Sequence, residues 1–437
     1  MVRKRSLPQG SFTAEVTGLD HEGRGVARID GKVTFIADAL PGETVEFRYT
    51  GRWRDRDEGQ VTAVQVASPQ RVAPSCAHFG VCGGCALQHL APESQIAWKQ
   101  SELVNSFARI GRVEPREIVP PLTGPSLGYR RRARLGVKFV EKKGGTLVGF
   151  RERGCSFLAT LERCVVLDPR VGLKLREIAA MIDRLAIRQA IPQIEMAAAD
   201  HVTLVFRVLQ NPSEQDREIL AGFGAEHGFE ILLQPGGLDS IQPLVPPRRG
   251  LSYSPDGSDA RLSFLPADFI QVNGTLSQAM VRQSLQWLAP QPGEPVLELF
   301  AGLGNFTVPL AKTGAKVTAV EGDAGLVARG AANCMANGVG EVRWHVADLF
   351  KPDPKAEYLR EHHPAVLIDP PRAGAQEIMP ILIAQKPRRI VYVSCHPGTL
   401  ARDAALLAEG GYRLEKAGAM DMFPHTSHVE SMALFVR

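Results

Sequence analysis

Short runs of alternating apolar and polar residues fill the region from residue 8 to residue 68. The run Lys32-Val-Thr-Phe-Ile36 is typical, and the turn pairs Asp30-Gly31 and Pro41-Gly42 separate neighbouring runs. A period of two residues bounded by glycine-containing turns is typical of half-buried strands joined as hairpins. The pattern predicts a small antiparallel β-barrel at this end of the chain.

The pattern changes after Ser68-Pro69 and becomes mixed. Residues 93–110 have the apolar spacing of a helix, with Ile96, Leu103 and Phe107 on one side. Further along, strands are expected at 133–140 and 202–208, and a helix at 171–187. We therefore predict a central α+β region over residues 69–266.

Short apolar strands alternate with helical segments from Pro295 to the end. The predicted strands are 296–299, 316–320, 342–346, 365–368 and 390–394. Strands that alternate with helices form parallel, doubly wound sheets. The last third is therefore expected to be an α/β Rossmann-like domain.

Composition sets outer bounds on the class of protein. The chain has 437 residues, which is enough for several domains, and 44% of them are hydrophobic, which is ordinary for globular proteins. Because no apolar run is long enough to span a bilayer, we expect a cytoplasmic protein without a membrane association. The net charge of +4 is too small to indicate a nucleic-acid partner without local clustering.

A glycine-containing turn follows the first predicted strand of the last third. The segment from Val296 to Val308 reads VLELFAGLGNFTV, with Gly302 and Gly304 in the turn. Open α/β sheets bind ligands where such a turn leaves the carboxyl end of a strand. The spacing is not that of the dinucleotide fingerprint G-x-G-x-x-G, and it resembles the S-adenosylmethionine (SAM) motif of class I methyltransferases.

Acidic residues end the next strands of this sheet. Glu321 closes the second strand, where a carboxylate bonds ribose hydroxyls, and Asp348 follows the third, where this fold contacts adenine.

The fourth strand ends in Asp369-Pro-Pro-Arg372. This resembles the motif of amino-group methyltransferases, but Arg372 replaces their aromatic residue, which counts against methylation of adenine or glutamine.

A thiol and a carboxylate are expected near the same edge. The fifth strand leads into Cys395, and the apolar final strand begins at Glu430. A free cysteine is most often an inert core residue, and a glutamate at a strand start is often exposed. Burial of Glu430 would be costly unless it were paired or catalytic.

Taken together, the motifs DPPR, SCHP and FPHTSHVE resemble the RNA uracil-C5 methyltransferase family. Within that family, the cysteine-rich N-terminal part is similar to the 23S ribosomal RNA enzymes that methylate uracil 1939. The segment from Phe269 to Asn273, FIQVN, also matches the family's approach to the SAM fold.

The resemblance implies a role for each of these residues. Cys395 adds to C6 of uracil and so activates C5 to attack the methyl group of SAM, and Glu430 then removes the C5 proton. Asp369 and Arg372 line the pyrimidine and SAM site. The residues that bind the cofactor are Gln271, Phe300, Asn305, Glu321, Asp348 and Asp369.

Three of the seven cysteines lie close together in the sequence, and a fourth lies further on. Cys76, Cys82 and Cys85 have the spacing C-x5-C-x2-C, and Cys164 is a candidate fourth ligand. Four thiolates suit zinc or an iron–sulfur cluster, and the spacing alone favours zinc. The family resemblance instead implies a [4Fe–4S] cluster, and the spacing differs from the C-x3-C-x2-C of radical SAM enzymes.

Two basic segments are candidate RNA contacts. Arg52, Arg54 and Arg56 flank Trp53, although acidic neighbours oppose this interpretation, and residues 130–134 read RRRAR. Basic side chains beside an aromatic ring suit phosphate pairing and base stacking. The N-terminal barrel itself resembles a TRAM domain, an OB-like RNA-binding module.

The sequence therefore predicts a multidomain protein. The expected domains are a TRAM-like barrel over 1–68, a central α+β iron–sulfur domain over 69–266 and a class I SAM methyltransferase domain over 267–437. The expected function is methylation of uridine C5 in 23S ribosomal RNA. The alternatives are methylation of the tRNA T-loop uridine and a non-catalytic RNA-binding assembly factor; nothing indicates an obligate protein partner.

Overall fold

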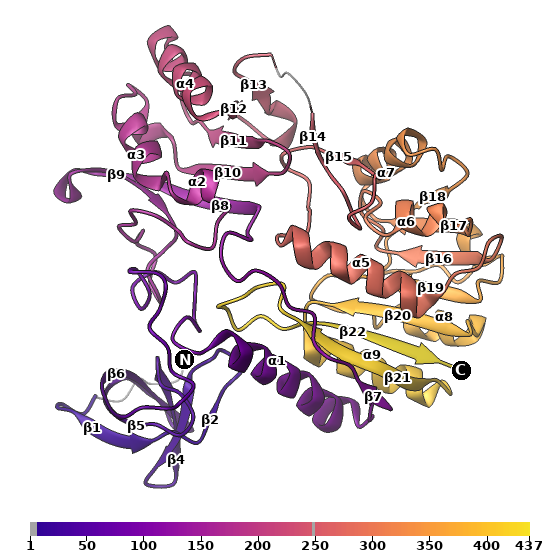
Figure 1. The fold of residues 1–437 in the computed structure, drawn as a ribbon, viewed down its shortest axis with the longest axis horizontal. Coiled ribbons are helices and arrows are strands. Elements are labelled where there is room, and N and C mark those ends of the chain that lie inside the picture. Colours follow the sequence, from indigo (N-terminus) through magenta and orange to yellow (C-terminus); the bar gives the residue numbers. More distant parts are fainter. Residues whose placement is uncertain (1–6, 247–249) are drawn as a thin grey trace. The chain divides into compact units, whose positions relative to one another are not determined.

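The computed structural model describes residues 7–246 and 250–437, so the expected first domain begins outside the described residues (Figure 1). The chain divides into two compact units that are not continuous in sequence. The first unit contains Met1–Trp98, Phe150–Ala159 and Phe423–Ser427, and the second contains the rest. The motif FPHTSHVE is thus divided between the units after Ser427. The division into domains at residues 68 and 266 stays a prediction.

A curled six-stranded sheet forms the core of the first unit. Its strands are β1 (Phe12–Glu15), β2 (Gly18–Leu19), β3 (Gly25–Ile29), β4 (Lys32–Ala37), β5 (Thr44–Arg52) and β6 (Arg56–Val66). The run from β1 to β2 pairs with β5 at one end and with β3 at the other, so the sheet closes on itself. Ala27, Ile36, Val45 and Phe47 fill the interior. The barrel is not wholly antiparallel, because β6 returns beside β4 in the parallel sense.

A single helix follows the cysteine-containing loop. Helix α1 (Pro92–Ser106) is continued by a π-helical turn, Phe107–Gly111, so the helix predicted at 93–110 is confirmed. The boundary between the two units falls inside α1, between Trp98 and Lys99. Beyond the turn, the short strand β7 (Glu117–Ile118) pairs with β21 (Arg413–Met420) far along the chain.

The central part of the second unit is a mixed six-stranded sheet. Its strands, in spatial order, are β13 (Gln242–Pro243), β12 (Phe229–Gln234), β11 (Val202–Arg207), β10 (Gln193–Ala198), β8 (Arg132–Val140) and β9 (Gly145–Gly149). The helices of this region are α2 (Pro169–Gly172), α3 (Leu175–Asp183) and α4 (Glu214–His227). The helix predicted at 171–187 is therefore two shorter helices, and the α+β character is as expected. A hairpin of β14 (Leu251–Tyr253) and β15 (Leu262–Phe264) follows.

An eight-stranded sheet forms the last third. Its order is β18-β17-β16-β19-β20-β22-β21-β7, with β18 (Arg343–Val346), β17 (Lys316–Glu321), β16 (Pro295–Leu299), β19 (Ala365–Ile368), β20 (Arg389–Ser394) and β22 (Glu430–Val436). The strands from β18 to β20 are parallel, and β22 is antiparallel to both neighbours. All five predicted strands are found to within one residue at either end.

Five helices accompany this sheet (Figure 1). They are α5 (Gly274–Leu288), α6 (Thr307–Lys312), α7 (Ala324–Ala336), α8 (Met379–Gln385) and α9 (Pro397–Glu409). Short 3-10 turns lie at Glu141–Lys143, Arg188–Ala190, Leu238–Ser240 and Glu357–Leu359. A search of the described residues finds no helix with the length and apolarity that a membrane crossing requires.

Candidate active site

The register of the parallel strands brings the predicted site residues to one edge of the sheet. Leu299 of β16 lies beside Val320 of β17 and Ile368 of β19. The next residue of each strand or loop is therefore Phe300, Glu321 or Asp369. Open α/β sheets bind their ligands at this carboxyl edge, so three residues distant in the sequence meet where a ligand is expected.

The antiparallel pairing of β20 with β22 adds the thiol and the second carboxyl group. Ser394 lies opposite Ser431, and the Ser431 hydroxyl lies 3.5 Å from the Ser394 carbonyl oxygen. One step further, Cys395 leaves β20 where Glu430 begins β22. Glu430 is only 7% exposed, which excludes the interpretation that it is a solvated strand end.

The electrostatics show that these acidic groups are crowded. Burial raises the pKa of the Cys395 thiol to about 12, with further contributions from Glu430 and Asp369, while Arg372 acts in the opposite direction. Burial raises the pKa of Asp369 to about 7. Burial and the charge of Asp369 also raise the pKa of Glu430 well above its usual value. The arrangement therefore favours the protonated forms of these three groups. A cation bound among them would stabilise their charged forms.

Lys99 is a site residue that the sequence reasoning missed. Its side chain is fully buried and its Nζ donates to Oδ1 of Asp421 at 2.7 Å. The Lys99 charge also counteracts the rise in the pKa of Glu430. The sequence did contain a sign of this burial. Lys99 follows Ile96 by three residues and precedes Leu103 by four, and this spacing puts Lys99 on the apolar side of the helix.

The glycine turn after β16 has the shape that a ligand requires. Gly302 has φ of +57°, and a Cβ built on it would meet no atom within 4 Å. The space before the turn is thus open, and glycine is needed for the left-handed backbone rather than for packing. The Gly302 amide donates to Oε2 of Glu321 at 3.0 Å, which ties the turn to the end of β17. These features fit the binding of a nucleoside-containing cofactor.

Asp348 and a second aromatic ring lie at the end of β18. Oδ1 of Asp348 accepts from the Phe350 amide at 2.9 Å. The ring of Phe350 lies 5.9 Å from the ring of Phe300, and its side chain is 38% exposed. Phe350 was not predicted, since only the fold places it beside Phe300. Two rings at this edge provide an apolar surface of the kind an adenine base stacks on.

Asn305 and Gln271 are linked to residues of the central region. The Tyr253 hydroxyl donates to Oδ1 of Asn305 at 3.1 Å. The carbonyl oxygen of Gln271 accepts from Nε of Arg131 at 2.8 Å. Neither Tyr253 nor Arg131 was predicted to belong to this site, because their sequence positions lie far from the glycine turn.

Comparison with known proteins identifies the family. The profile described as "tRNA (Uracil-5-)-methyltransferase" matches residues 256–348 and 356–437, and a TRAM domain profile matches residues 11–48. The chain is 49% identical to a protein of Alkalilimnicola ehrlichii and 50% identical to one of Xanthomonas axonopodis pv. citri. Both are named "23S rRNA (uracil(1939)-C(5))-methyltransferase RlmD", and the alignments cover 100% of this chain and 98% and 100% of those proteins.

The chain belongs to the family of 23S rRNA (uracil-C5)-methyltransferases. The TRAM match and the doubly wound sheet confirm the barrel and the Rossmann-like methyltransferase fold.

A solved structure shares this fold over almost the whole chain. It is the tRNA (uracil-54, C5)-methyltransferase of Pyrococcus abyssi in complex with S-adenosyl-L-homocysteine. Its TM-score is 0.75, with 24% identity and coverage of 97% of this chain and 99% of that one. At this identity the likeness concerns the fold alone.

The cysteine loop of this methyltransferase lies in the first unit. The backbone amide of Gly84 donates to Sγ of Cys82 at 3.4 Å, and burial, with a contribution from Cys76, raises the pKa of the Cys82 thiol. Cys164 is buried in the second unit. Over residues 7–246 and 250–437, no group of three or more Cys, His, Asp or Glu side chains forms a metal-binding cluster. The structure thus does not show the expected iron–sulfur domain.

The basic segment of the barrel is a turn with partly paired charges. Arg56 lies over the ring of Trp53 at 5.1 Å and 3.4 Å from Asp55, and Arg52 lies 3.6 Å from Asp57. Arg54 is exposed. The acidic neighbours therefore take up part of the positive charge.

The arginines at 130–134 differ in their surroundings, and their contact with RNA stays a prediction. Arg131 reaches into the protein, and Arg132 donates to the Pro266 carbonyl oxygen and to Glu195. Arg134 is exposed but also pairs with Glu195 at 3.0 Å. Arg132 and Arg134 lie two residues apart on β8 and share a face, where Glu195 takes up part of their charge.

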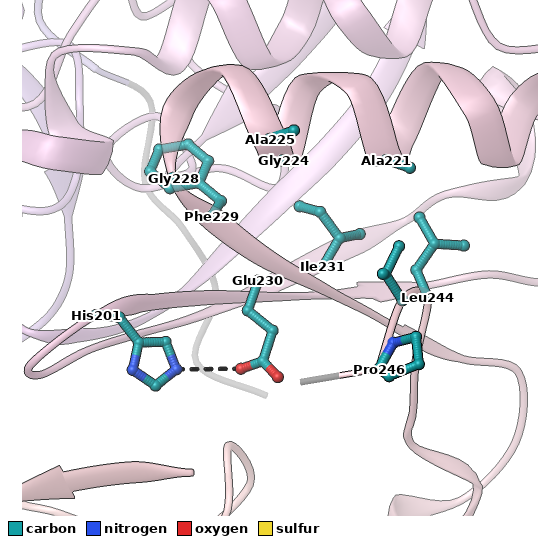
Figure 2. A pocket seen from close by; sticks show the side chains of 11 residues that line it. His201, Ala221, Gly224, Ala225, Gly228, Phe229, Glu230, Ile231, Leu244 and Pro246 are labelled. Atoms are coloured by element: carbon teal, nitrogen blue, oxygen red, sulfur yellow. Dashed lines mark hydrogen bonds and ion pairs between the residues drawn. The ribbon is translucent and has the colours of Figure 1, made fainter. Parts of the chain in front are cut away.

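A separate cavity of about 390 Å³ lies in the central region (Figure 2). Figure 2 shows α4 along one side of it and the His201–Glu230 contact, 3.2 Å long, on the other. None of the predicted site residues lines this cavity. It is therefore not part of the site at the sheet edge.

Proposed function

We propose that this chain transfers a methyl group from SAM to C5 of a uridine in 23S ribosomal RNA, the one called uracil 1939 in the names of its relatives. The observation that carries the proposal is that Cys395 and Glu430 lie one residue beyond the Ser394–Ser431 pair, where the charges of Glu430 and Asp369 both act on the Cys395 thiol. A ribosomal RNA substrate makes the cytoplasm the expected site of action.

The first step requires a thiolate. The Cys395 thiolate adds to C6 of uracil, and the electron pair of the C5–C6 double bond forms an enolate. C5 then attacks the methyl carbon of SAM, the carbon–sulfur bond breaks, and S-adenosylhomocysteine leaves as a neutral thioether. Because the sulfonium of SAM is a cation, its arrival near Asp369 and Cys395 favours their charged forms.

The second step releases the enzyme. C5 of the adduct carries both the methyl group and a hydrogen atom, and the Glu430 carboxylate takes that hydrogen as a proton. The C5–C6 double bond re-forms while the bond from C6 to the Cys395 sulfur breaks, which regenerates the thiolate. A positioned base of this kind typically contributes about 10²–10⁴-fold to the rate. The nearby Lys99 charge counteracts protonation of Glu430 and so helps to keep it available.

Two variants of this pair test the mechanism. We expect Glu430→Gln to form the adduct but fail to resolve it, so a labelled rRNA fragment migrates with the protein on a denaturing gel. Cys395→Ala is expected to give no such band and no product, whereas Cys155→Ala, which changes an exposed cysteine, behaves as the wild type. Product formation by Cys395→Ala at the wild-type rate would contradict the mechanism.

Nucleoside mass spectrometry on unmodified transcripts tests the substrate. We expect 5-methyluridine to appear in the 23S rRNA fragment and not in tRNA. Its appearance in tRNA alone would leave the chemistry intact and overturn the rRNA assignment. Its absence from both would favour the non-catalytic RNA-binding alternative.

We also propose that Cys76, Cys82, Cys85 and Cys164 bind a [4Fe–4S] cluster. The support is their spacing, the family resemblance and the amide donor to the Cys82 sulfur, a contact that also occurs around iron–sulfur clusters. No step of the methyl transfer depends on this cluster. Zinc remains the alternative metal.

Metal analysis of protein purified without oxygen tests this assignment. We expect about four iron atoms per chain in the wild type and in Cys155→Ser, and a large loss of iron and of visible absorbance in Cys82→Ser. Zinc in place of iron, or an iron content unaffected by Cys82→Ser, would contradict it.

A further inference from the structure

Two exposed polar side chains lie on the segments that flank Cys395 at the edge of the sheet. Strand β20 lies between β19 and β22, so Cys395 has the loop after β19 on one side and the residues before β22 on the other. Arg372 belongs to that loop, and His428 lies two residues before β22; both are exposed. The two residues therefore border the proposed nucleophile where a substrate is expected.

A hydrogen bond holds the Arg372 segment beside the loop that carries Cys395. The Thr399 hydroxyl donates to the carbonyl oxygen of Arg372 at 3.3 Å, and Thr399 lies in the first turn of α9, four residues after Cys395. Burial raises the pKa of the Cys395 thiol, and the charge of Arg372 opposes that rise. The hydrogen bond and the charge both place Arg372 near the proposed nucleophile.

Arg130 brings a second guanidinium to this place from the segment that precedes β8. Its backbone forms a β-bridge with Asn273, the N-cap residue of α5. Desolvation lowers the pKa of His428, and the charges of Arg372, Lys99 and Arg130 add to that shift. Arg130 and Arg372 thus both lie near His428, and we call these three residues the Arg–His cluster.

The two arginines of the Arg–His cluster are available to a ligand. Among the residues that the structure describes, neither Arg130 nor Arg372 pairs with a carboxylate, whereas Arg132 and Arg134 both pair with Glu195. Arg372 is exposed and Arg130 is half-buried, and neither has a side-chain nitrogen that is buried without a partner. Water can therefore reach the donors that these contacts leave over, and an anion can take its place.

We propose that the Arg–His cluster binds a phosphodiester of the RNA next to the target uridine. This inference rests on the proposed function and adds which groups hold the nucleotide. A base reaches an enzyme pocket when its nucleotide leaves the stack, and the phosphates that flank this nucleotide then come close to the pocket. Guanidinium groups bind phosphate oxygens through paired hydrogen bonds. Such contacts fix the position of the nucleotide rather than its sequence.

The acidic groups of the site explain why cations are needed there. Glu430 and Asp369 both act on the Cys395 thiol, and when ionised they repel a phosphodiester that approaches the nucleophile. Exposed guanidinium groups offset this repulsion. The neutral uracil ring can then enter beside the carboxyl groups while its phosphate stays with the arginines.

Equilibrium binding of altered RNAs tests the proposal. The probes are an unmodified 23S rRNA fragment that contains the target uridine and two versions that carry a single neutral methylphosphonate, on the 5′ or the 3′ side of that uridine. We expect the wild type to bind one of the two neutral versions about tenfold more weakly than the unmodified fragment, because hydrogen bonds to charged groups are among the stronger ones.

Variants of the cluster identify the groups that make this contact. Arg130→Gln should weaken binding of the unmodified fragment by about tenfold and of the sensitive neutral version by less than about threefold, because the charge contact is already absent there. His428→Ala should show the same pattern with a smaller loss, about threefold. Both should bind S-adenosylhomocysteine as the wild type does. Lys138→Gln, an exposed change on β8 that removes the same charge, should keep the wild-type ratio between the RNAs.

Other results would overturn the proposal. Equal binding of the three RNAs by the wild type would do so, even if a variant fails to fold. Weaker binding of S-adenosylhomocysteine by Arg130→Gln, with unchanged RNA affinity, would assign the guanidinium to the cofactor instead. An equal change of the RNA ratio in Lys138→Gln would show an effect of overall charge. Absence of 5-methyluridine from every RNA incubated with SAM would instead contradict the proposed function.

Discussion

Three carboxyl groups dominate the electrostatics of the site at the residue scale. Glu298 and Glu430 are buried, and Asp369 is half-buried. Their pKa values are all raised, chiefly by burial. Each carboxyl group therefore resists ionisation in the free protein. The sequence showed that acidic residues end these strands, but their protonation depends on what surrounds them, which only the fold determines.

Glu298 gives a prediction about stability and pH. Its pKa is raised to about 8 in the folded protein, against 4.5 when it is exposed. The neutral form is therefore the one that folds favourably, so this contribution is complete below pH 4.5 and is lost as the pH rises through 8. We expect Glu298→Gln to unfold at the wild-type temperature near pH 5 and at a higher temperature than the wild type near pH 9.

Thermal unfolding across this pH range measures the effect. The exposed Glu409→Gln is the control and should follow the wild type at every pH. Parallel curves for wild type and Glu298→Gln would show that the Glu298 carboxyl ionises normally in the folded protein.

The strand pairings decide the geometry of the site at the element scale. The five parallel strands could be predicted because each is a short apolar run bounded by turn residues. The parallel pairing of β6 with β4 could not be predicted, because it joins residues more than twenty positions apart. For the same reason, the register that brings Cys395 to Glu430 follows from the pairing of β20 with β22 and not from either strand alone.

The buried pair of Lys99 and Asp421 gives a prediction at this scale, since it attaches the second half of α1 to the residue that follows β21. We expect Lys99→Met to destabilise the second unit by roughly 3–5 kcal/mol, because it leaves the Asp421 carboxyl buried without this partner. Adding Asp421→Asn should recover part of the loss. Denaturant unfolding measures both.

Lys416→Met is the matched control for this pair. Lys416 contacts Glu117 at 3.0 Å, but both side chains are substantially exposed, so the loss should be below about 1 kcal/mol. An equal effect of the two lysine substitutions would contradict the importance of burial.

The division into two units is the main finding at the scale of the whole molecule. Phe150–Ala159 and Phe423–Ser427 join the N-terminal barrel and the cysteine loop in the first unit. His425, for example, accepts from the amides of Ala86 and Leu87 through its carbonyl oxygen. Contiguous domain ranges drawn from composition could not anticipate this, because such contacts join segments hundreds of residues apart.

RNA binding gives a prediction for the whole chain. The net charge of +4 is small, so binding must depend on local phosphate contacts whose strength falls with salt. We expect the logarithm of the rRNA association constant to fall linearly with that of the salt concentration. Arg54→Ala, which removes an exposed charge of the barrel turn, should reduce the slope by about 0.7–0.9.

Filter binding of an rRNA fragment at several salt concentrations checks this prediction. Glu15→Gln, an exposed change on the same barrel that removes no positive charge, is the comparison. A salt-independent affinity would contradict phosphate contacts as the source of binding.

The sequence by itself determined the doubly wound sheet, the barrel, the glycine turn and the acidic and thiol residues that follow successive strands. These depend on local periodicity, on turn residues and on the rule that parallel strands share a carboxyl edge. Only the tertiary structure decided that Lys99 is buried, that Arg132 and Arg134 both pair with Glu195, and that Glu430 is enclosed. The physical reason is that burial and charge pairing depend on neighbours from distant parts of the chain, which local patterns do not record.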